Sequence, residues 1–126
     1  MLFCKIASGE IPGLSVAEEV FSAYHVSIFV NAVAKKGREM YDLPMFANAW
    51  LVHKGDVAGK YPSGGPQSRM HEVWHFCAPT IDVLCPDIYV PEFLEVCDDY
   101  SRNQPLFIPE AATPPPWCRA SCSAWM

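Results

Sequence analysis

The sequence lacks the features of several broad classes of protein. No stretch approaches the roughly 18 consecutive apolar residues that a membrane span requires, and the N-terminus lacks the basic-then-apolar pattern of a secretory signal. Lys and Arg never cluster beyond the pair Lys35-Lys36, and the net charge is -5. We therefore expect neither a membrane nor a nucleic acid as a partner.

The chain also lacks a C-x-x-C pair, although it contains six cysteines. Cys77, Cys85 and Cys97 stand in apolar surroundings, which predicts buried free thiols because a free cysteine packs as a small hydrophobic residue. The others, Cys4, Cys118 and Cys122, show no spacing that indicates a function. We expect no cofactor.

What is present is apolar enough for a folded domain, since 51 % of the 126 residues are hydrophobic and 18 % are charged. Ser15 and Glu18 have the spacing of a capping box. After them, Phe21, Tyr24 and Ile28 recur at helical spacing up to Gly37, where we expect the helix to stop. This pattern predicts a helix over residues 16–36.

Downstream, strand-like and helix-like segments alternate. The short apolar run at 44–51 predicts a buried strand, and the glycine-rich stretch 53–66 predicts a loop. We expect further helices at 67–77 and 92–100, and further strands at 81–89 and 105–110. This order is typical of parallel βα units, in an open doubly wound sheet or in part of a (β/α) barrel.

No Gly-rich phosphate loop follows these strands, which argues against a nucleotide-binding sheet. Polar and aromatic residues stand at the strand ends instead: Asn48, Trp50, Asp87, Tyr89 and Glu110. In barrels the carboxyl ends of the strands build the active site. These five residues are therefore the candidate site, although Asn48, Asp87 and Trp50 could equally be loop caps and core.

Four segments carry a resemblance to a known family: "LPMFANAWL", "YPSGGP", "IDVLCPDIYVPEF" and "PLFIPEA". Together they resemble the central part of bacterial β-galactosidases of glycoside hydrolase family 35, over about residues 18–111. The resemblance implies a partial (β/α) TIM barrel of about three βα units, with strands five to seven of eight. It places Glu110 at the position of the catalytic nucleophile of a retaining glycosidase.

The same resemblance implies roles for the other candidates and a β-galactoside or related carbohydrate as the ligand. Tyr89 would hydrogen-bond the nucleophile and keep it ionised, Asn48 and Asp87 would hold sugar hydroxyls, and Trp50 would stack on a pyranose face or close the pocket. A retaining enzyme also needs a second carboxylate as acid/base. Residues 1–15 contain none in the right context, so we expect the chain to be inactive alone.

The two ends differ from this family. The segment "FCKIASGEIP" is similar to the opening of histidine-triad nucleotide hydrolases, which makes nucleotide hydrolysis the second hypothesis. The four histidines are nevertheless dispersed, and no alternating triad is present. We expect residues 1–15 to be an extension of different origin, residues 16–111 to be the partial barrel, and residues 112–126 to be a disordered tail.

Two further hypotheses remain. His71, Glu72 and His75 satisfy the zinc-protease pattern H-E-x-x-H, but no third ligand is identifiable, and we expect no bound metal. The chain could also be a non-catalytic gene remnant. In that case, as in any partial barrel, open sheet edges would favour self-association.

Overall fold

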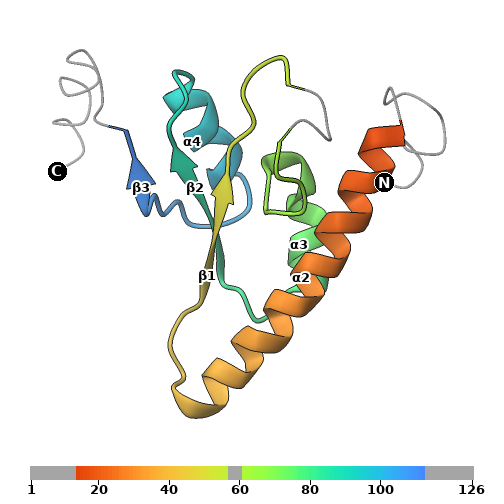
Figure 1. Ribbon diagram of the computed structural model, residues 1–126. Coiled ribbons are helices and arrows are strands. Elements are labelled where there is room, and N and C mark those ends of the chain that lie inside the picture. The colour runs from red at the N-terminus through yellow and green to blue at the C-terminus, as the bar shows by residue number, and fades with distance from the viewer. Residues whose placement is uncertain (1–13, 57–60, 113–126) are drawn as a thin grey trace, which may run out of the picture.

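The computed structural model describes residues 14–56 and 61–112. Its elements follow the order α2 (Leu14–Met40), β1 (Phe46–Trp50), η1 (Ser68–Met70), α3 (His71–Cys77), β2 (Val83–Ile88), α4 (Phe93–Ser101) and β3 (Glu110–Ala111) (Figure 1). The predicted alternation of helices and strands is confirmed. Among the described helices, none is long and apolar enough to cross a membrane.

The three strands form one parallel sheet in the order β1-β2-β3. Phe46 of β1 pairs with Val83 of β2, and the register continues to Trp50 opposite Asp87. The third strand is much shorter than predicted, because only Glu110 and Ala111 pair with β2. The described part of the chain is therefore a mixed α/β fold with an open three-stranded parallel sheet.

The segment 105–109, predicted as strand, runs outside the ladder. Leu106 and Phe107 remain 40 % and 47 % exposed, and the Phe107 ring packs edge-on against Phe46 at 5.1 Å between centroids. The Gln104 side chain occupies the edge of β2 here, accepting from Leu84 N and donating to Leu84 O, and Pro105 and Pro109 have no backbone N–H to give to a ladder.

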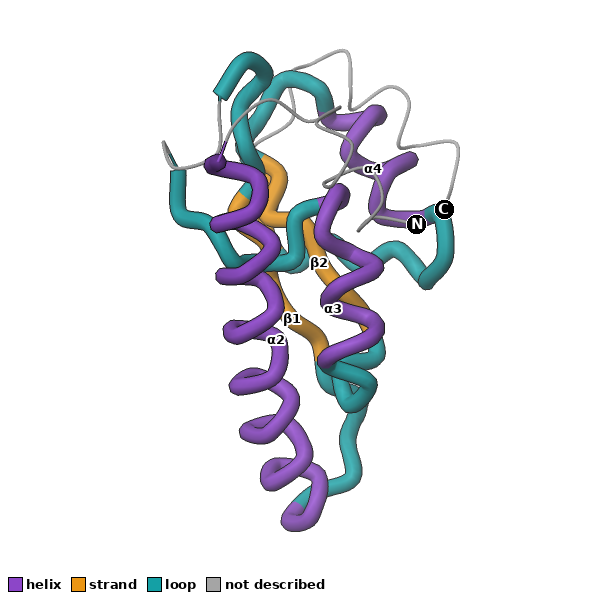
Figure 2. Tube along the Cα trace, turned by 90° about the vertical axis from the view of Figure 1, so that its right-hand side faces the viewer, coloured by secondary structure: helices purple, strands orange, loops and turns teal. Residues whose placement is uncertain are grey.

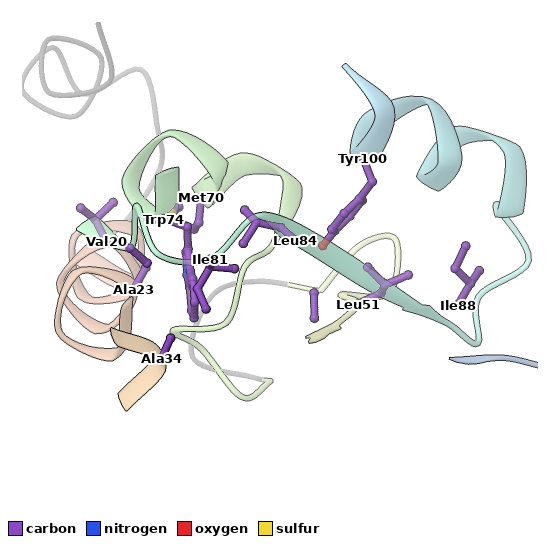
Figure 3. Close-up of a cluster of buried hydrophobic side chains, with 12 residues drawn as sticks. Val20, Ala23, Ala34, Leu51, Met70, Trp74, Ile81, Leu84, Ile88 and Tyr100 are labelled. Atoms are coloured by element: carbon purple, nitrogen blue, oxygen red, sulfur yellow. The ribbon is translucent and has the colours of Figure 1, made fainter. Parts of the chain in front are cut away.

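The helices lie on one face of the sheet. α4 packs on β2, and α2 packs on α3 instead of on a strand (Figures 2 and 3). The core lies between these helices and the sheet, as Figure 3 shows. It consists of Val20, Ala23, Ala34, Ala49, Leu51, Met70, Trp74, Ala78, Ile81, Leu84, Ile88 and Tyr100.

No described helix covers the opposite face of the sheet, although the segment 105–109 contacts it at Phe46, and the prediction of a buried β1 is therefore only half right. Ala49 is fully buried, whereas Phe46 and Trp50 are 51 % and 59 % exposed. Successive side chains of a strand point to opposite faces. One face of β1 thus enters the core and the other faces solvent.

Helix α2 differs from its prediction in length and in orientation. It runs through Gly37 to Met40, because Gly37 keeps a helical conformation while the Met45 side chain packs closely against it. It also begins at Leu14, so Ser15 lies inside the helix and is not its N-cap. The residues whose spacing predicts the helix, Phe21 among them, face solvent.

The second and third predicted helices are confirmed, the former as η1 followed by α3. In that pair Met70 and Trp74 are buried and Val73 packs against the core, as their spacing predicts. Of the cysteines, Cys85 is a buried free thiol, Cys77 is free but half-buried, and Cys97 is half-buried. Cys4, Cys118 and Cys122 lie outside the described residues.

Candidate functional site

The five candidate residues lie together near the carboxyl ends of β1 and β2, where β3 begins with Glu110. Trp50 pairs in register with Asp87, and Asp87 pairs with Glu110. Residues paired across parallel strands point to the same face of a sheet. These three side chains therefore project from the uncovered face, and Asn48 and Tyr89 share it because each stands two residues from a member of this row.

Two side-chain hydrogen bonds organise this row. Asn48 Nδ2 donates to Asp87 Oδ1 at 2.9 Å, which joins β1 to β2. Tyr89 Oη donates to Glu110 Oε2, also at 2.9 Å, which joins the end of β2 to β3. The sequence-based expectation that Glu110 lies within reach of Tyr89 is thus confirmed.

The electrostatics of the row follow from these contacts. The pKa of Asp87 is raised, chiefly by burial and also by the charge of Glu110, and the hydrogen bond from Asn48 partly offsets the increase. The pKa of Tyr89 is raised chiefly by its hydrogen bond to Glu110. The phenol therefore stays protonated at neutral pH and acts as the donor in that bond.

This arrangement supplies a carboxylate with an oriented oxygen, a second carboxylate on the neighbouring strand, an amide and two exposed aromatic rings. Tyr89 and Trp50 are 56 % and 59 % exposed. Such groups can hydrogen-bond hydroxyls and stack on an apolar ring face. The row lies on an open surface and not in an enclosed pocket.

A cavity of about 210 Å³ lies apart from this row and was not predicted. Its lining comes from the end of β1, from η1 and from α4, and includes Lys54, Arg69, Glu92 and Asp99. No single motif marks it in the sequence, because residues far apart along the chain build it. Two of its five charged lining residues form ion pairs within the described part of the chain, Arg69 with Glu19 and Asp99 with Arg102.

The zinc-like pair lies on α3, as predicted, with the His71 and His75 rings 5.9 Å apart. His71 is half-buried and packs edge-on against Tyr100 at 4.5 Å. Within residues 14–56 and 61–112 there is no group of three His, Cys, Asp or Glu side chains that could hold a metal ion.

The histidine-triad hypothesis gains nothing from the described residues. His25 lies on α2, His53 lies in the loop after β1, and the other two histidines lie on α3. The segment "FCKIASGEIP" falls outside the described residues. No model of a known protein family matches the chain, and no curated protein matches it either.

Proposed function

We propose that this chain carries half of the catalytic site of a retaining β-galactosidase, on three βα units of a (β/α) barrel of the glycoside hydrolase family 35 type. The observation that supports this proposal best is the hydrogen bond from Tyr89 Oη to Glu110 Oε2. This bond holds an oriented carboxylate beside the carboxyl end of β2, at the edge of the sheet where barrel enzymes build their active sites.

In this proposal Glu110 attacks the anomeric carbon of the sugar and forms a glycosyl-enzyme intermediate, which water then hydrolyses. Tyr89 positions the attacking carboxylate by holding one of its oxygens. Asn48 and Asp87, already joined by a hydrogen bond, present donors and acceptors to the sugar hydroxyls. Trp50 offers its exposed ring to the apolar face of the pyranose.

The proposal requires a second carboxylate about 5 to 5.5 Å from the first, to protonate the leaving oxygen. In the family this residue comes from an earlier barrel strand. General acid–base assistance contributes typically 10² to 10⁴-fold to such reactions. We therefore expect the 126-residue chain alone to hydrolyse unactivated β-galactosides no faster than background.

A chimaera tests the proposal by supplying the missing barrel units, with their acid/base glutamate, from a family 35 enzyme. The substrate is a dinitrophenyl β-galactoside, whose leaving group needs little protonation, so its turnover reports nucleophilic attack. We expect Glu110→Gln to lower kcat/KM in the chimaera by at least roughly a thousandfold.

Glu95→Gln is the matched control, because Glu95 is an exposed glutamate on α4. This variant is expected to keep turnover within about twofold of the parent, as is usual for exposed positions away from the site. Full activity in the Glu110→Gln chimaera, with Glu95→Gln also active, would show that Glu110 is structural and that the proposed nucleophile is wrong.

A further inference from the structure

Helix α2 presents to solvent a stripe of residues with alternating three- and four-residue spacing. This is the spacing of the a and d positions of a coiled coil, which form the contact seam between two helices. All six members of the stripe are exposed. In chain order they are Glu18, Phe21, His25, Ile28, Ala32 and Lys35.

The stripe lies opposite the face that α2 uses inside the molecule. The buried side of α2 carries Val20 and otherwise mainly small or polar residues such as Ala23, Ser27 and Ala34, and α2 packs against α3. Phe21 and Ile28 are 64 % and 42 % exposed on the other side. A helix with apolar side chains on its solvent face commonly marks an interaction surface.

Aromatic contacts already order part of this stripe. The Phe21 and His25 rings lie 4.3 Å apart, and the His25 and Tyr24 rings meet edge-on at 5.2 Å. The cluster occupies the N-terminal half of the stripe, whereas the small Ala32 occupies the C-terminal half. Large and small residues are thus distributed unequally along it.

When a second α2 helix lies antiparallel to the first, the large residues of each helix face smaller residues of the other. An axis of two-fold symmetry midway between Val26 and Ser27 sets Phe21 opposite Ala32 of a second copy and His25 opposite Ile28. It also sets Glu18 opposite Lys35 at both ends of the seam. Neither charge has an ion-pair partner elsewhere in the described part of the chain.

We propose that two copies of this chain associate through antiparallel pairing of their α2 helices along this stripe. A two-fold axis makes each contact occur twice, so both Glu18–Lys35 pairs and both Phe21–Ala32 contacts form together. Antiparallel packing also sets the opposite ends of the two helix dipoles side by side. The seam extends about 25 Å along the helix axis.

The second copy suits this surface better than an unrelated partner, because the charge pattern is matched within the helix itself. The surface is also separate from the open sheet edges and from the row of polar residues at the strand ends. Pairing through α2 therefore leaves Glu110 and Tyr89 accessible.

Charge reversal tests the proposal by sedimentation equilibrium on the full 126-residue chain under reducing conditions, over a range of protein concentrations. The parent is expected to dimerise. Glu18→Lys and Lys35→Glu each replace two attractive contacts by two repulsive ones, and each should raise the dimer dissociation constant by about tenfold. The double variant E18K/K35E restores opposite charges and should return within about threefold of the parent.

Glu72→Lys on α3 is the control, since it makes the same charge change at an exposed position outside the stripe. It should leave the dissociation constant unchanged, and circular dichroism should show native helix content in every variant. A parent that stays monomeric would overturn the proposal. So would association that both single reversals leave intact, as expected of pairing through sheet edges.

Discussion

Glu19 is a charged residue placed in the interior, with only 1 % of its surface exposed. Tyr61 Oη and Arg69 Nη2 both donate to its Oε1, at 2.9 and 3.0 Å. Its other oxygen has no hydrogen-bond partner among the described residues. Burial raises the pKa of Glu19, and Arg69 opposes this increase. Arg69 is thus the charge that makes burial of this carboxylate tolerable.

We expect Arg69→Met to lower the free energy of unfolding at pH 7 by about 3 kcal/mol, because it leaves a buried carboxylate without its counter-charge. The loss should shrink as the pH falls toward the ordinary pKa of glutamate, about 4.3, since a protonated Glu19 needs no counter-charge. Urea unfolding at several pH values measures both effects.

Arg102→Met provides the comparison for this prediction. Arg102 also forms an ion pair, with Asp99, but its side chain is 72 % exposed and Asp99 is not fully buried. Exposed pairs contribute roughly 0 to 1 kcal/mol. Equal losses in the two variants would contradict the role assigned to Arg69.

At the scale of elements, the sequence predicts those segments whose pattern reflects local geometry. β1, β2, α3 and α4 all lie where apolar spacing and turn residues place them. β3 could not be predicted in length, because the sequence does not reveal that the Gln104 side chain occupies the edge of β2 ahead of it. The buried face of α2 could not be predicted either, because Ala23 and Ser27 are too small or too polar to stand out in a pattern of large apolar residues.

In the candidate site and around it, some contacts follow from the order of the strands and others do not. Parallel strands bring their carboxyl ends to one edge, so Asp87 and Glu110 could be predicted as neighbours from the strand order alone. The contact of Glu19 with Arg69 could not, because the two residues lie on separate elements and the sequence carries no spacing that relates them.

The loop before η1 packs against α2 at Gly64, where a larger residue would be both strained and crowded. Gly64 has φ +104°, and a Cβ atom there would lie 3.0 Å from Val26 Cγ2. Its carbonyl also accepts a hydrogen bond from Trp74 Nε1. We expect Gly64→Ala to cost about 2 to 3 kcal/mol of stability, measured by thermal or urea unfolding.

Gly55 separates the two causes of this cost. It also has a positive φ, +96°, but a Cβ atom there would meet nothing within 4 Å. Gly55→Ala therefore carries only the backbone strain, about 1 kcal/mol. If both variants lose the same stability, the close contact beneath α2 contributes nothing.

For the whole molecule, we expect the response to acid to depend on His71, a half-buried histidine that the fold favours in its neutral form. Burial, with a smaller contribution from His75, lowers the pKa of His71 to about 4. The unfolded chain binds this proton near pH 6.5. Stability contributed by neutral His71 is therefore complete above pH 6.5 and is lost progressively as the pH falls toward 4.

Other groups also titrate in acid. Glu19 has a raised pKa, so its protonation increases the stability of the fold as the pH falls, which is opposite to the effect of His71. Asp82 has a lowered pKa, chiefly because the Met45 amide donates to it, and its contribution is lost only below about pH 4. Comparison of variants with the parent protein is thus needed to isolate His71.

We expect His71→Phe to remove about 1 to 2 kcal/mol of the stability difference between pH 7 and pH 4.5, after allowance for solvent screening. Urea unfolding at the two pH values measures this difference. His53→Gln, at an exposed loop position, should keep the parent's pH dependence. An unchanged pH dependence in His71→Phe would exclude His71 as the acid-sensitive group.

The strand order has a consequence for how the chain is made. In the described sheet each later strand pairs with the strand that precedes it, β2 with β1 and β3 with β2. A ribosome releases the strands in the same order, so each finds its template already in place when it emerges. The sheet can grow by addition at one edge during synthesis, and β1 need not wait for the C-terminal end of the chain.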